Sequence, residues 1–198
     1  MDWQKLAVKI FTEPPDRLPL TQFIEVFHGW IQATEGFYHD VADYSHMYAG
    51  PGIVLLAADA NLAVDEGENR RGLLFTQKKR LSGSNQEKLA AVLRAALENC
   101  RKLEEEKRLN PPIKFSGNEI FVAVNDRLEA PNSEEVFKAV KPEFEAVARR
   151  LFAGAPFALK RDGDPRKRFN VTIMAAQRFD ARTLLENLQK NHGAGAQV

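Results

Sequence analysis

The stretch Glu119–Leu128, EIFVAVNDRL, decides the fold, because its pattern occurs twice in the chain. Near the start, the run Leu6–Phe11, LAVKIF, is followed by Asp16–Leu18, DRL. Apolar runs rich in β-branched and aromatic side chains are typical of buried β-strands. The same strand and the same Asp-Arg-Leu exit therefore predict a duplicated unit.

The elements after each exit also agree in their order, because each copy continues with an amphipathic helix and then a hairpin. In the first copy these are a helix from Leu20 and strands at Gly52–Leu56 and Gly72–Thr76; in the second, a helix between Ser133 and Phe152 and strands at Phe157–Lys160 and Phe169–Ile173. The first copy has an insertion, Phe37–Tyr44, whose alternating side chains indicate one more strand.

Helices separated by short strands and hairpins favour an α+β protein. We expect a mainly antiparallel sheet covered by helices, with internal duplication of a β-α-β-β unit; a parallel α/β sheet is the alternative. The chain, residues 1–198, is expected to form a single domain of two similar halves, about 6–80 and 118–176.

A helix at about 84–108 is expected to join the halves. Ser84 and Glu87 have the spacing of a capping box, and Pro111 and Pro112 follow its end. The charged run Glu104–Arg108 is interpreted as its solvated tip. A shorter terminal helix is expected from Asp180, with its stop at Gly193.

Composition excludes several classes of function. The 198 residues have a net charge of +1, so affinity for nucleic acid in general is not expected. Cys100 is the only cysteine, which rules out an intrachain disulfide and favours a reducing compartment. The longest apolar run, Ile53–Ala58, is too short to span a bilayer, and the first residues lack a signal peptide. We therefore expect a cytoplasmic protein with no membrane partner.

The densest polar cluster lies in the insertion and the turn after it. Strand alternation places Asp40 and Tyr44 on one face and Asp43 on the other, with His46 in the turn. These side chains could bind a ligand or partner, or act in proton transfer. They could also simply form the solvent-exposed face of a strand. No spacing of a known zinc motif is present, so no metal site is predicted.

Basic residues gather in both hairpins, and Arg127 and Arg166 are candidate anion contacts. If the halves are related by a pseudo-twofold axis, these clusters could form one phosphate-binding edge. The alternative is that lysine and arginine discourage edge-to-edge aggregation of strands.

Short motifs spread over nearly the whole chain form a recognisable set. They are Val26–Gln32 (VFHGWIQ), Asp40–His46 (DVADYSH) with Gly50–Gly52, Arg71–Leu74 (RGLL), Asn125–Leu128 (NDRL) with Ala130–Asn132, and Asp164–Phe169 (DPRKRF). Together they resemble a family of uncharacterised bacterial proteins of about 200 residues. The resemblance implies a bacterial cytoplasmic protein and no particular activity. Members often have Gly-His where this chain has Ala57 and Ala58.

The leading hypothesis is a non-enzymatic module that binds a small molecule or a protein at a groove beside the inserted strand. Its candidate contacts are Asp40, Asp43, Tyr44, His46, Arg127 and Arg166. The alternative is an enzyme that uses an Asp, His and Tyr constellation for proton transfer or hydrolysis, with or without a metal. A structural subunit, such as a homodimer, is a third hypothesis. The sequence identifies no cofactor.

Overall fold

The structure is a computed structural model of the chain and describes residues 1–14, 16 and 18–190. Its strands are β1 (Leu6–Thr12), β2 (Tyr38–Tyr44), β3 (Gly52–Ala57), β4 (Ala60–Asp65), β5 (Gly72–Gln77), β6 (Phe115–Val124), β7 (Phe157–Arg161) and β8 (Phe169–Ala175). Its helices are α1 (Leu20–Ala33), α2 (Asn85–Glu104), α3 (Glu134–Leu151) and α4 (Ala181–Lys190), and a short 3₁₀ turn, η1, spans Gly67–Asn69.

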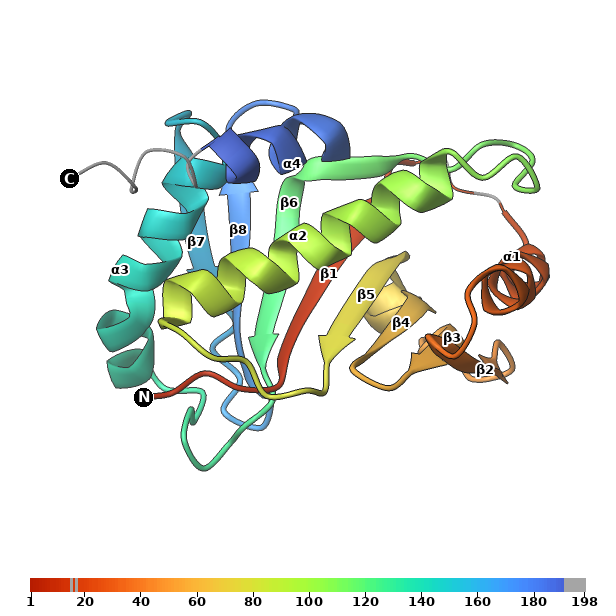
Figure 1. Cartoon of the computed structure of the whole chain (residues 1–198). Coiled ribbons are helices and arrows are strands. Elements are labelled where there is room, and N and C mark those ends of the chain that lie inside the picture. The colour runs from red at the N-terminus through yellow and green to blue at the C-terminus, as the bar shows by residue number, and fades with distance from the viewer. Residues whose placement is uncertain (15, 17, 191–198) are drawn as a thin grey trace.

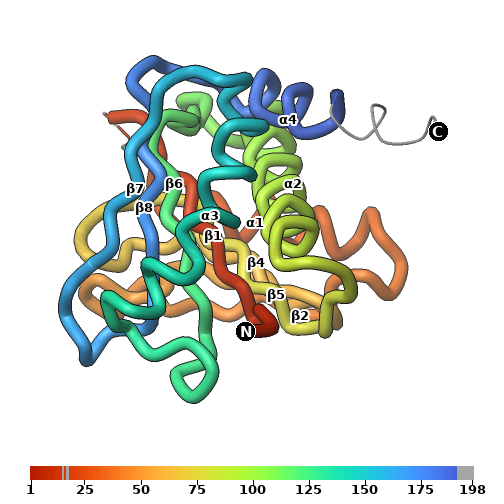
Figure 2. Tube along the Cα trace, turned by 90° about the vertical axis from the view of Figure 1, so that its left-hand side faces the viewer, coloured from red at the N-terminus to blue at the C-terminus, as the bar shows by residue number. Residues whose placement is uncertain are grey.

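All eight strands form one sheet, in the order β2-β3-β4-β5-β1-β6-β8-β7. Every neighbouring pair is antiparallel, so the predicted α+β class is confirmed and the parallel alternative is wrong. The sheet and the helices form two layers, with α2 crossing the middle of the sheet (Figure 1). Figure 2 shows α2, α3 and α4 on the same side of β6, β7 and β8.

Strand alternation explains why one face of the sheet carries the core. In β1, Val8 and Ile10 are fully buried beneath the helices, while Lys9 between them points to the opposite face. The same period places large side chains of β6 and β8 against the helices. Phe144 of α3 then packs between the rings of Trp3 and Phe169. Burial of these side chains provides the main driving force for folding.

Helix α2 begins where the sequence predicts. The Ser84 hydroxyl accepts a hydrogen bond from the Glu87 amide, and the Glu87 carboxylate accepts one from the Ser84 amide, which completes the capping box. The helix packs against β1 and β5 below it and against α3 and α4 beside it. It therefore joins the two halves of the chain and also covers the centre of the sheet.

The two halves have similar positions about the central pair β1 and β6. β5 lies beside β1 as β8 lies beside β6, and β4 and β7 follow on the outer sides. This sheet order is compatible with duplication, which stays a prediction. The predicted first hairpin is wrong, however, because β4 separates Gly52–Leu56 from Gly72–Thr76. The chain reverses at Ala58 and Asp59 and pairs with itself at once, so β4 has the place beside β5 that β7 has beside β8.

The insertion changes the place of α1. Strands β2 and β3 extend the sheet beyond β4, and α1 packs on these two strands. Phe23, Phe27 and Trp30 supply its buried stripe. By contrast, α3 and α4 lie close to α2 and to each other over the other half. The space beside α2 over β4 and β5 therefore has no covering helix.

The last two helices agree with the sequence in outline. Helix α3 is capped by the hydroxyl of Ser133 and continues through Pro142 as a single helix. The Asp180 carboxylate accepts a hydrogen bond from the Thr183 amide at the start of α4. The predicted stop of α4 at Gly193 lies outside the described residues. Among the described residues, no helix has both the length and the apolar character that crossing a bilayer requires.

Candidate functional site

The predicted site residues of the inserted strand do not converge. The register of β2 places Asp40 and Tyr44 on one face of the sheet and Asp43 on the other, as the alternation predicts. Asp40 accepts a hydrogen bond from the amide of Val41, and Asp43 accepts one from the amide of Ser45. The bonds from Ser45 lower the pKa of the Asp43 carboxyl. Both carboxylates are exposed and bond to neighbouring backbone.

His46 belongs to the turn between β2 and β3, which Gly52 shapes. Gly52 has a φ of 63°, and a Cβ there would lie 2.1 Å from the carbonyl oxygen of Val64, so only glycine fits. His46 lines a cavity of about 780 Å³ with Tyr48 and Arg71. No hydrogen bond between described residues joins His46 to Asp43 or Tyr44, so the predicted constellation is not assembled.

Arg127 and Arg166 lie together but far from the inserted strand. The Arg127 guanidinium donates to the carbonyl oxygen of Arg166 at 2.8 Å, and Arg166 forms an ion pair with Asp164 at 2.9 Å. They lie beyond Val124, which pairs with the start of β1. The turn that holds His46 lies level with the end of β1, at the opposite edge of the sheet. The six predicted residues therefore belong to two separate surfaces.

The predicted basic clusters are largely neutralised by carboxylates. Lys167 of the second hairpin contacts Glu68 at 2.5 Å and Asp162 at 2.8 Å. In the first hairpin, Arg70 forms a bidentate pair with Glu119. These contacts connect the two hairpins across the face opposite the helices. They bring basic and acidic groups together rather than forming one basic edge.

The face opposite the helices also holds a buried ion pair. Lys9 contacts Asp65, and its ammonium donates to the carbonyl oxygen of Gly67 at 3.2 Å. A cavity of about 610 Å³ lies above this pair and is also lined by Phe121. The charge of Lys9 is already paired, but Lys160, Asp162 and Arg168 also line this cavity, so it offers a ligand charged as well as apolar contacts.

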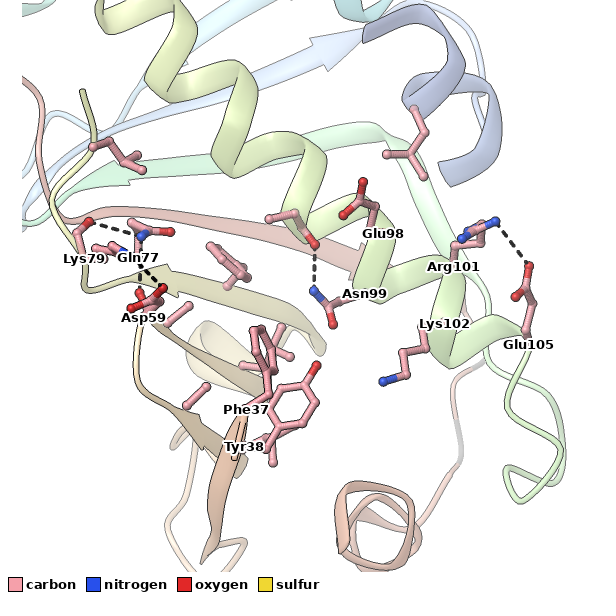
Figure 3. A pocket seen from close by; sticks show the side chains of 18 of the residues that line it. Phe37, Tyr38, Asp59, Gln77, Lys79, Glu98, Asn99, Arg101, Lys102 and Glu105 are labelled. Atoms are coloured by element: carbon pink, nitrogen blue, oxygen red, sulfur yellow. Dashed lines mark hydrogen bonds and ion pairs between the residues drawn. The ribbon is translucent and has the colours of Figure 1, made fainter. Parts of the chain in front are cut away.

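A large cavity lies on the helix side of the sheet, and we call it the α2 groove. It has a volume of about 950 Å³ and lies between α2 and strands β3, β4 and β5, with the end of α4 at its rim. Figure 3 shows it, with Asp59 and Gln77 at one end and Lys102 at the other. Its position follows from the place of α1, which covers β2 and β3 and leaves this part of the sheet free.

The floor of the α2 groove is apolar. Leu55 and Ala57 of β3, Leu62 of β4 and Phe75 of β5 contribute it, because alternate residues of these strands face the helices. Ala95 of α2 forms part of the opposite wall. A concave apolar surface of this volume is typical of small-molecule sites.

Lys102 is the cation at one end of the α2 groove. It lies on α2 two residues after Cys100, and its ammonium is 3.7 Å from the centre of the Trp30 ring and 5.4 Å from that of Tyr38. Burial lowers the pKa of Lys102 below its ordinary value. The ammonium is therefore partly desolvated and held by aromatic faces.

Three further polar groups face the same groove. The Asn99 amide nitrogen donates to the carbonyl oxygen of Ala95, which leaves the side-chain oxygen toward the cavity (Figure 3). Gln77 donates to the carbonyl oxygens of Asp59 and Lys79, which holds its side chain at the far end. Burial raises the pKa of the Tyr38 hydroxyl, so this group is a neutral donor at physiological pH.

Glu106 holds the aromatic support of Lys102 in place. Its carboxylate accepts a hydrogen bond from the Trp30 indole at 3.3 Å and pairs with Arg108 at 2.7 Å. The pKa of Glu106 is lowered to about 2, and the hydrogen bond from Arg108 is the largest cause of this shift. The interpretation of Glu104–Arg108 as a solvated tip agrees with the exposure of Glu105 and Lys107 but not with Glu106, because the chain folds back against α1 after α2 ends.

The described part of the chain has no candidate site for a metal ion or for a reactive thiol. No group of three or more His, Cys, Asp or Glu side chains there could hold a metal ion. Cys100 is fully buried in the core, and burial raises the pKa of its thiol well above the ordinary value. A thiol in that environment is not reactive.

The α2 groove was not among the sites expected from the sequence. Its residues come from α2, β2 to β5 and α4, and none of the residues that line it belongs to one of the sequence motifs. One signal was present, because Lys102 and Trp30 are amphipathic side chains near the ends of two predicted helices. Comparison of the chain with family models, curated proteins and solved structures gives no match.

Proposed function

We propose that this protein is a non-enzymatic binding module whose α2 groove takes a small, largely apolar molecule. The observation that carries the proposal is the combination of an apolar floor, with Leu62 and Phe75, and a rim of polar and charged side chains around it. The groove begins beside the inserted strand, since Phe37 and Tyr38 line it. The polar contacts proposed here are Lys102 and Gln77 in place of the exposed residues of the insertion.

The enzymatic alternative has less support. It needs Asp43, Tyr44 and His46 within hydrogen-bond reach of one another, and no hydrogen bond joins any two of these described residues. Asp43 and Tyr44 also leave β2 on opposite faces. Proton transfer between groups so placed is not favoured. Binding without chemistry is therefore the function that we propose.

A titration with the neutral fluorescent probe N-phenylnaphthylamine tests the proposal. We expect one saturable site in the native protein. Ala95→Trp should abolish binding because the indole fills the groove, whereas Ala91→Trp, on the exposed face of the same helix, should bind normally. Binding that survives in Ala95→Trp, or no saturable binding at all, would refute the proposal.

A protein partner is a second candidate function, favoured by the turn between β2 and β3. Tyr44 is 40% exposed, Met47 49% and Tyr48 88%, so large apolar side chains gather beside an edge strand. A homodimer through this turn is one form that such an interaction could take. Sedimentation velocity tests it: the native chain should be larger than a monomer, and Tyr48→Ser should restore the monomer.

We also propose that the protein is bacterial and cytoplasmic. The single cysteine supports a reducing compartment, because Cys100 is buried and free. The motifs that resemble a bacterial family support the source. Fractionation of a bacterial cell that carries the gene, with detection of the chain in each fraction, would test the location.

A further inference from the structure

Lys102 is the one groove-lining cation, among the described residues, that has no carboxylate within ion-pair distance. The others are paired: Lys79 contacts Asp59 at 3.2 Å, and Arg101 and Arg182 contact Glu105 at 4.0 and 3.8 Å. An ammonium that is partly removed from water and has no counter-ion is destabilised, and a bound anion would offset this cost. This ammonium lies at one end of a groove with an apolar floor, whose rim also carries the carboxylates Glu98 and Glu186.

The nearest candidate counter-ion is occupied. Glu106 is close enough to act on the charge of Lys102, but its two oxygens bond to Arg108 and to the Trp30 indole. The carboxylate therefore supports the ring that carries the ammonium instead of neutralising it. The three N–H donors of Lys102 have no hydrogen-bond acceptor among the described residues.

The position of the ammonium also differs from that of an ordinary surface lysine. A surface lysine lays its stem on apolar groups and extends its charge into water. The ammonium of Lys102 instead lies over Trp30 and points into the groove, toward Tyr38 (Figure 3). Cation-π contacts fix its place without using its donors. The Tyr38 hydroxyl, a second donor, lies on the same side.

We infer that the ligand of the α2 groove is an amphipathic anion, with its apolar body on the floor of β3 to β5 and its charged group against Lys102 and Tyr38. This inference rests on the proposed binding function. An ammonium and a hydroxyl that converge on one point suit a carboxylate, whose oxygens can accept from both. The volume of about 950 Å³ accommodates an apolar body of ten or so carbon atoms.

Three probes of equal chain length distinguish the effect of the head-group charge on affinity from that of the apolar body. They are decanoate, decanol and decylamine, each below its micellar concentration. Calorimetric titration of the native protein should show decanoate binding at least about tenfold more tightly than decanol. Decylamine should bind most weakly, because its ammonium would lie against that of Lys102.

Matched variants locate the charge that decides this preference. Lys102→Met keeps the stem over Trp30 but removes the charge, so it should lower decanoate affinity to that of decanol. Lys102→Arg should retain the preference. Lys107→Met, which removes an exposed charge one turn further along the chain, should change nothing. A thermal melt of each variant confirms that it is folded.

The outcomes distinguish the inference from the binding function on which it rests. If decanoate and decanol bind equally and both are lost in Ala95→Trp, the groove binds ligands but the anionic head group is wrong. A preference for decanoate that persists in Lys102→Met would overturn the inference in the same way. If none of the three probes binds, the binding function and the inference both fail.

Discussion

Helices pack differently on the two halves of the sheet. Over β6, β7 and β8, the helices α3 and α4 pack on each other and on α2, and Phe144, Val147 and Leu151 are fully buried. On the other half of the sheet, α2 alone packs on β5 among the described helices, and α1 lies further out, on β2 and β3. The comparison teaches that the α2 groove lies where the helix layer is least continuous, between α1 on β2 and β3 and α2 on β1 and β5.

The largest expected effect contrasts one phenylalanine from each half. Phe144→Ala should lower the free energy of unfolding by about 3–5 kcal/mol, because a fully buried ring leaves a closed cavity between Trp3 and Phe169. Phe75→Ala should cost less, about 2 kcal/mol, because this ring has the open groove on one side. Urea denaturation measures both. Equal losses would show that the two halves are equally well packed.

The reverse substitution sharpens the same contrast. Ala148→Trp places an indole among fully buried neighbours and should destabilise the protein by about 1–3 kcal/mol or more. Ala95→Trp places the same group in the groove and should change the free energy of unfolding by less than about 1 kcal/mol. Thermal unfolding of both variants makes the comparison. A loss in Ala95→Trp as large as that in Ala148→Trp would mean that the groove has no room.

The pH dependence of stability should reveal the role of Glu106. Its pKa is about 2 in the folded protein against an ordinary value of 4.5, so the ionised form stabilises the fold. This contribution is fully present above about 4.5 and is lost as the pH falls toward 2. Glu106→Gln should therefore lower the free energy of unfolding at neutral pH by about 1 kcal/mol, a low value for a charged hydrogen bond because the pair is partly exposed.

Acid titration of the native protein and Glu106→Gln measures the difference. The two stabilities should approach each other as the pH falls from 4.5 toward 2. Glu129→Gln, which removes an exposed carboxylate without an ion pair among the described residues, should be close to the native protein throughout. A constant difference between native protein and Glu106→Gln at every pH would exclude an effect of ionisation.

The smallest expected effect concerns the residues that the sequence made prominent. Asp43→Ala and His46→Ala should each leave the free energy of unfolding close to that of the native protein, because both side chains are exposed. Binding of N-phenylnaphthylamine should also be unchanged. Loss of probe binding in both variants would place the ligand at the turn and not in the α2 groove.

Local pattern predicted most elements well but not the partners of the strands. The capping box at Ser84, the start of α1 at Leu20 and the alternation of the inserted strand all match the structure. These signals depend on neighbours along the chain, so the sequence contains them in full. The predicted pairing of β3 with β5 was wrong, because pairing depends on which strands meet in space. β4 lies between these two strands and pairs with both.

The candidate site could not be predicted, because its residues matter only through their surroundings. Asp43 and His46 have chemically versatile side chains, yet the fold leaves both of these described residues exposed, with no hydrogen bond between them. Lys102 is one of many lysines in the sequence. It becomes distinctive only when Trp30 and Tyr38 lie beside it and Glu106 is taken by Arg108.

The sequence by itself determined the class of the fold, the positions of most helices and strands and the face of each that is apolar, because periodicity and capping are local properties. Only the tertiary structure decided where α1 would lie, and hence that the sheet beside α2 would be left uncovered. It also decided which charge would lack a partner. Both outcomes depend on contacts between segments far apart in the chain, which no local pattern records.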